Sequence, residues 1–230
     1  MHILGIRVKD PAVYQSVFVH KSAVRELHER GFGGVDTYER LELLGDSIIN
    51  FVVAKFLFDK YPAHREGWLT RIRTKLVCSK QLCVFAQQLR LQDFIVMNRK
   101  ALSSGWNCNP RILEDCFEAL VGALYLDLGL LPAKMFVLGM IERCVDFAVI
   151  EMCDNWKDQL MRYTQSKGIA LPVYQMLEQT DPTVFDIVAV VDGVPCGRGQ
   201  NRAKKEAEQQ AAQEALQVLG VPPDCIDGLP

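Results

Sequence analysis

Apolar residues in the first 150 positions recur every three or four residues, which is the spacing of a buried helix face. In the central stretch, residues 39–58, the apolar positions run from Leu41 through Ile48 and Phe51 to Leu57. The pattern predicts further helices over residues 11–24, 66–76, 77–89, 112–127 and 135–149, with a loop over residues 97–110. Residues 1–150 are therefore predicted to form a mainly α-helical domain.

The pattern changes after a short linker predicted at residues 151–155. A helix is predicted over residues 156–166, β-rich runs over 173–177 and 185–191, and a turn at Gly193 that leads into a third strand from Val194. An Ala- and Gln-rich helix over residues 204–219 follows, and residues 221–230 form a short tail. The order α-β-β-β-α predicts a small α+β domain over residues 155–220.

The helix over residues 39–58 carries an unusual run of acids. Glu39, Glu42 and Asp46 are three and four residues apart, so at about 100° per residue they share one stripe. Like charges in this arrangement destabilise a helix by a few tenths of a kcal/mol per pair, unless a cation lies between them.

A second acidic pair, Asp115 and Glu118, lies in the helix over residues 112–127 and is followed by the small residues Ala119, Gly122 and Ala123. If the two helices cross at Gly45 and at the side that carries Ala119 and Gly122, then Glu42, Asp46, Asp115 and Glu118 converge in one oxygen-only cluster. Such a cluster suits Mg²⁺ or Mn²⁺ better than zinc, because no His or Cys stands at ligand spacing. A solvated acidic helix face also explains these charges, and both interpretations stay open at this point.

Two motifs resemble a known family. Residues 39–47, ERLELLGDS, resemble the signature of ribonuclease III, with Leu43 where the family usually has Phe. Residues 115–119, DCFEA, resemble its second acidic motif. The resemblance covers nearly the whole chain, from Leu4-Gly5 and the VHKS segment at residues 19–22 through a C-terminal double-stranded-RNA-binding domain.

The resemblance implies an endoribonuclease that needs Mg²⁺, for which Mn²⁺ substitutes, and that cuts double-stranded RNA to leave 5′-phosphate and 3′-hydroxyl ends. The implied metal-binding carboxylates are Glu42, Asp46, Asp115 and Glu118, with Asp46 and Glu118 the catalytic pair. The family also implies a homodimer, with Glu39 and Glu66 close to the dimer interface and the substrate cleft. A helix-start acid favoured by the helix dipole is the simpler explanation of Glu66.

The C-terminal domain has a basic stretch between Gly197 and Lys205 that contains no acid. Lys204 and Lys205 open a helix, where ammonium groups and backbone N–H groups together suit a phosphate. The predicted RNA-binding residues are Lys157, Arg162, Arg198, Arg202, Lys204 and Lys205. The first helix departs from the family pattern, because Met161 and Arg162 follow Leu160 where the family usually has Gln-Glu. The loop at residues 180–184 is shorter than usual and lacks a His.

Composition sets the remaining bounds. The net charge of −2 is low for a nucleic-acid binder unless the basic residues are clustered. The eight cysteines form no CxxC pair, which predicts free thiols in a reducing compartment. No signal peptide or membrane span is predicted, so we expect a cytoplasmic protein without a membrane partner. His20 is interpreted as structural.

Two other functions remain open from the sequence. A protein that binds and sequesters double-stranded RNA without cutting it, as a regulator or silencing suppressor, would be expected to lose one of the four carboxylates. A helical metal-dependent nucleotide hydrolase would also use acidic helices, but the RNA-binding module argues against it.

Overall fold

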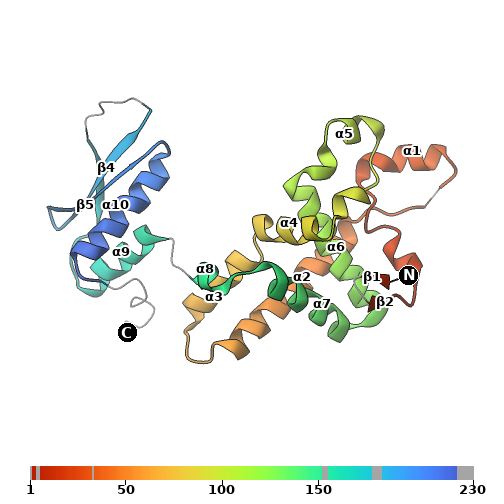
Figure 1. Cartoon of the computed structure of the whole chain (residues 1–230), viewed down its shortest axis with the longest axis horizontal. Coiled ribbons are helices and arrows are strands. Elements are labelled where there is room, and N and C mark those ends of the chain that lie inside the picture. The colour runs from red at the N-terminus through yellow and green to blue at the C-terminus, as the bar shows by residue number, and fades with distance from the viewer. Residues whose placement is uncertain (1, 4–5, 33, 152–154, 178–182, 222–230) are drawn as a thin grey trace. The chain divides into compact units, whose positions relative to one another are not determined.

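The computed structural model describes residues 2–3, 6–32, 34–151, 155–177 and 183–221, in two compact units, residues 1–150 and 151–230 (Figure 1). The first unit is mainly helical, as predicted, apart from a small antiparallel pair formed by β1 (His2–Ile3) and β2 (Ile6–Arg7). Its helices are α1 Val24–Glu29, α2 Glu39–Lys60, α3 Glu66–Leu76, α4 Ser79–Gln88, α5 Arg99–Ser103, α6 Pro110–Leu128 and α7 Leu130–Cys144, with α8 Phe147–Glu151 at the boundary.

The first unit is built around the crossing of α2 and α6. A Cβ added at Gly45 of α2 would lie 1.8 Å from the carbonyl oxygen of Glu118, and one at Gly122 of α6 would lie 2.3 Å from that of Leu41. The two backbones are therefore in contact where the sequence predicted a crossing. Only glycine, which has no side chain, permits this approach.

The predicted buried stripe of α2 is partly wrong. Leu41, Ile48 and Leu57 are buried, but Phe51 is 56% exposed. Phe51 lies with Leu43 and Phe58 on a second, exposed apolar stripe of the same helix, whereas Ile49 and Val53 complete the buried one. Apolar spacing alone does not separate two adjacent stripes of one helix.

Four other predicted elements need correction. Residues 11–24 form 3₁₀ turns at Pro11–Tyr14 and Lys21–Ala23 instead of a helix, because the backbone of Phe18 and His20 bonds to Val96. The segment 97–110, predicted as a loop, contains α5. The side chain of Asn98 caps the start of this helix. The 77–89 helix begins only at Ser79, since Cys78 is extended. The 135–149 helix is replaced by α7, which starts five residues earlier, and by α8.

The second unit has the predicted order, α9 Trp156–Ser166, β3 Val173–Met176, β4 Phe185–Val191, β5 Val194–Asn201 and α10 Lys204–Val218. The three strands form an antiparallel sheet in the order β3-β4-β5. One side of β4 packs on α9 and α10 through buried Ile187, Ala189 and Leu160. The shortened loop at residues 180–184 lies mostly outside the described residues, as do Leu4 and Gly5.

Helix α10 also covers the outer edge of β5. Gly197 and Gly199 leave no room for a Cβ against the α10 backbone, so the helix approaches closely. From this position Glu214 accepts a hydrogen bond from the backbone N–H of Arg198 at 2.7 Å, and Gln210 accepts one from Gln200 at 3.1 Å. Two edge N–H groups of β5, those of Arg198 and Gln200, are thus bonded to helix side chains.

The glycine contact predicts a large effect on stability. We expect Gly45→Ala to lower the free energy of unfolding by about 3 kcal/mol or more, because the added methyl group forces the two backbones apart. Gly139→Ala in α7 is the matched control. Nothing lies within 4 Å of its Cβ position, so the better helix former should raise stability by about 1 kcal/mol. Urea unfolding followed by circular dichroism measures both, and an unchanged midpoint for Gly45→Ala would contradict the prediction.

Candidate active site and RNA-binding surface

The helix crossing brings three carboxylates together. Oxygen atoms of Glu42, Asp115 and Glu118 all lie within 4.8 Å of one another. Glu118 is the most enclosed, with 7% of its surface exposed, because it projects from α6 directly beside the contact with Gly45. Two of these residues come from α6 and one from α2, so the cluster depends on the crossing.

The cluster holds its negative charges at an energetic cost. Burial, followed by the charges of Asp46 and Glu114, raises the pKa of Glu118 to about 8. Burial also raises the pKa of Asp115, helped by Glu114, and that of Glu42, helped by Asp115. A divalent cation would relieve both the repulsion and the burial cost. The donors are hard carboxylate oxygens, which fit Mg²⁺ or Mn²⁺.

Asp46 lies at the margin of this cluster. It is exposed, and Asn50 holds it by donating a hydrogen bond of 2.7 Å to its Oδ1. Asp46 is outside the group of three carboxylates defined above, although its charge contributes to the raised pKa of Glu118. Of the four carboxylates predicted to converge, the structure therefore brings three into contact range and leaves the fourth beside them.

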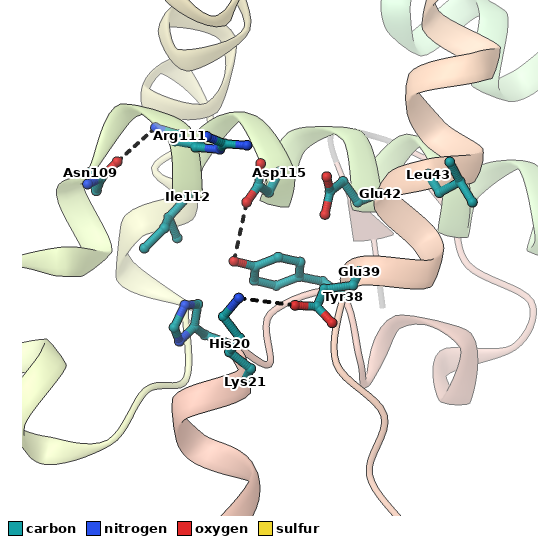
Figure 2. Close-up of a pocket in the computed structure, with 10 residues that line it drawn as sticks. All are labelled: His20, Lys21, Tyr38, Glu39, Glu42, Leu43, Asn109, Arg111, Ile112 and Asp115. Carbon is teal, nitrogen blue, oxygen red and sulfur yellow. Dashed lines mark hydrogen bonds and ion pairs between the residues drawn. The ribbon is translucent and has the colours of Figure 1, made fainter.

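A pocket of about 580 Å³ opens beside Glu42 and Asp115 (Figure 2). Residues 20–21 and the first turns of α2 and α6 form its walls. Tyr38 and Arg111 line it and were not predicted. The Tyr38 hydroxyl donates a long hydrogen bond of 3.5 Å to Oδ2 of Asp115. The sequence could have indicated Arg111, since this residue precedes Asp115 by one helical turn. For Tyr38 the sequence offered nothing beyond its place at the start of α2.

The two acids assigned to the interface and cleft lie in different places. Glu39 lines the pocket, with its Oε1 3.5 Å from Nζ of Lys21. Glu66 is not among the pocket residues. It lies in the first turn of α3, where its Oε1 accepts a hydrogen bond of 2.8 Å from Thr70. His20 is buried in the pocket wall, and its Nδ1 accepts a hydrogen bond from the backbone N–H of Ser22, a structural capping role.

Three of the six predicted RNA-binding cations are engaged within the domain. Lys157 forms an ion pair with Glu208 and lies 4.6 Å from the centre of the Tyr174 ring. Arg162 pairs with Asp158 at 2.8 Å. Arg198 donates two hydrogen bonds to Asp186, and the one from its Nε is 2.8 Å long.

The other three cations, Arg202, Lys204 and Lys205, are exposed and have no ion-pair partner within the described residues. Lys204 and Lys205 occupy the first turn of α10, which no side chain caps. The charge available to a phosphate is therefore concentrated at this helix start.

Comparison with known proteins agrees with the family resemblance of both units. Residues 10–143 match a family model described as ribonuclease-III-like, and residues 156–219 match the double-stranded RNA binding motif. Ribonuclease 3 of Listeria monocytogenes is 34% identical over 94% of this chain and 94% of that protein. Putative protein A464R of Paramecium bursaria Chlorella virus 1 is 35% identical, over 98% of this chain and 80% of that protein. The nuclease domain of Campylobacter jejuni ribonuclease III is similar in structure, with a TM-score of 0.55 and 35% identity over 61% of this chain and 92% of that one.

The chain belongs to the ribonuclease III family, as the two sequence motifs indicated. It combines a ribonuclease-III-like domain with a double-stranded-RNA-binding domain, and the predicted fold class is confirmed. No helix within the described residues is both long and apolar enough to span a membrane.

The Arg198–Asp186 pair predicts how the RNA-binding domain responds to acid. Hydrogen bonds from Arg198 and Gln200 lower the pKa of Asp186 from 3.8 to about 2. Its contribution to stability is therefore complete above about pH 4 and is lost as the pH falls toward 2. Asp186→Asn should flatten this part of the stability profile, whereas Asp158→Asn, in the exposed pair with Arg162, should not. Folded-state amide signals of β4 and β5 in NMR spectra of the full chain report the change, and equal profiles for wild type and Asp186→Asn would refute it.

Proposed function

We propose that the carboxylate cluster at the α2–α6 crossing is the active site of this double-stranded-RNA endoribonuclease. The observation that carries the proposal is the approach of Glu42, Asp115 and Glu118 to within 4.8 Å in a chain that also has an RNA-binding domain. Asp46 completes the set from the margin, and Asp46 and Glu118 are the catalytic pair. Products carry 5′-phosphate and 3′-hydroxyl ends.

Mg²⁺ is the proposed cofactor, with Mn²⁺ as a substitute, held by Glu42, Asp46, Asp115 and Glu118. When bound, the metal supplies Lewis-acid activation of the scissile phosphate and of the attacking water. The side chains supply placement. Asn50 holds Asp46 toward the margin, and Tyr38 holds one oxygen of Asp115. Helix α6 holds Glu118 with only 7% of its surface exposed, where electrostatic interactions are strong.

We also propose that the protein acts as a homodimer. The exposed stripe of α2 supports this, because Leu43, Phe51 and Phe58 are 73%, 56% and 69% exposed, an apolar surface typical of a contact with another protein. The C. jejuni structure is described as showing flexibility in a region involved in dimer formation. In the proposed dimer, Glu39 lies beside the substrate cleft and Glu66 near the interface.

The C-terminal domain, assigned to residues 155–220, is proposed to grip the duplex through phosphates. Lys204 and Lys205 at the start of α10 carry most of this contact, supported by their exposure, with Arg202 beside them. Lys157, Arg162 and Arg198 contribute less, because each already has an acidic partner. The remaining assignments are a catalytic domain at residues 1–150, a tail at 221–230 and a cytoplasmic location, the last supported by six free thiols among the described cysteines.

Cleavage of a long RNA duplex by the purified protein tests the active site. Wild type should cut in Mg²⁺ and stop when a chelator is added. Glu118→Gln should lose more than about a hundredfold in rate, since an essential metal ligand is removed, while duplex binding persists. Glu142→Gln, on the exposed surface of α7, should cut normally. Binding without cutting by wild type, in both Mg²⁺ and Mn²⁺, would leave only the sequestering function.

The phosphate grip has its own test in a salt titration of duplex binding. Lys204→Ala with Lys205→Ala should weaken binding similarly for all duplex sequences. It should also reduce the slope of log affinity against log salt by about 2, because about one unit is lost per phosphate contact. Lys167→Ala, directly after the last residue of α9, serves as the control. A slope equal to that of wild type would show that α10 makes no phosphate contact.

A further inference from the structure

The pocket beside the carboxylates contains a cation for which the described residues offer no ion-pair partner. Arg111 is exposed in the first turn of α6, and Asn109 fixes its backbone by accepting a hydrogen bond of 2.9 Å from its N–H. Among the residues that the structure describes, no carboxylate lies within ion-pair distance, 4.0 Å, of its guanidinium. Two other exposed arginines of this unit, Arg25 and Arg90, each pair with an acid one turn away.

The Arg111 side chain nonetheless lies beside the proposed metal ligands. In Figure 2 it runs along α6 toward Asp115, on the wall of the pocket. Its positive charge lowers the pKa of both Glu42 and Asp115, against the upward effect of burial. Lys21 stands elsewhere on the same pocket wall and is paired with Glu39. The pocket thus has an acidic side formed by the cluster and a cationic position one helical turn away.

The chemistry of this position favours a phosphate. An RNA strand that places its scissile phosphate at the carboxylates must pass its neighbouring phosphates close by, where the acids repel them. A guanidinium offers a planar fork that binds two phosphate oxygens at once. Base stacking is disfavoured there, because the aromatic rings of the pocket, Tyr38 and His20, are buried in its wall.

We propose that Arg111 binds the phosphate adjacent to the scissile one on the strand being cut, and so sets the register of that strand at the carboxylates. The inference rests on the proposed function and adds a substrate-positioning contact to it. It assigns Arg111 to direct contact with RNA, as distinct from an effect exerted only through the charges of Glu42 and Asp115.

The test pairs a change in the protein with a change in the RNA. A short duplex with one fixed cleavage site is prepared with a single uncharged methylphosphonate at each position in turn on both sides of the cut. For wild-type protein, kcat/KM should fall about tenfold at one position next to the cut. For Arg111→Ala, kcat/KM on unmodified RNA should fall by a similar factor, mainly through KM, and that methylphosphonate should then cost nothing more.

Two variants sharpen the result. Arg143→Ala removes an exposed arginine from the last turn of α7, outside the pocket, and should keep the methylphosphonate penalty of wild type. Arg111→Lys keeps the charge and loses the fork, so it should retain part of the penalty. The slope of log KM against log salt should fall by about 1 in Arg111→Ala.

An unchanged KM together with the full methylphosphonate penalty in Arg111→Ala would overturn the inference. A variant that altered only the Mg²⁺ concentration needed for cutting would do the same, because Arg111 would then act solely on the metal ligands. Loss of the proposed function has a different signature, since wild type would then fail to cut even the unmodified duplex in Mg²⁺ or Mn²⁺.

Discussion

The contact between the α2 and α6 backbones is the constraint on which the first unit depends. Because Gly45 and Gly122 carry no side chain, each helix touches the other's carbonyl groups, and this approach brings Glu42 of one helix close to Asp115 and Glu118 of the other. Glu118 is both a neighbour of this contact and the most buried acid of the cluster. The close packing that stabilises the domain therefore also concentrates negative charge, and a bound cation would offset this charge.

The two units distribute charge in opposite ways. In the first, the clustered acids have no ion-pair partner among the described residues, although Arg111 lies beside them, and the charge balance is left for a ligand to complete. In the second, Asp186, Asp158 and Glu208 each neutralise one cation, which leaves positive charge concentrated at the start of α10. A low net charge is therefore compatible with RNA binding, because the position of the unpaired charges matters more than their number.

The sequence predicted most of what local spacing determines. The α2 and α6 helices, the glycine crossing and the order of the second unit followed from periodicity and small residues. What it missed depends on contacts between distant segments. The pairing of Phe18 and His20 with Val96 overrides the helical pattern of residues 11–24. The partners of Arg198 and Lys157 lie 12 and 51 residues away, so their pairing could not be read from nearby sequence.

The bonded edge of β5 has a consequence for how these molecules behave when crowded together. An exposed strand edge is a template on which another chain can add, and several copies on one long duplex would face each other at high local concentration. Gln210 and Glu214 occupy two of the N–H groups that such an addition would need, those of Gln200 and Arg198. Addition of another strand at β5 would have to break both bonds, so this edge of the sheet is protected against joining its counterpart in a neighbouring copy.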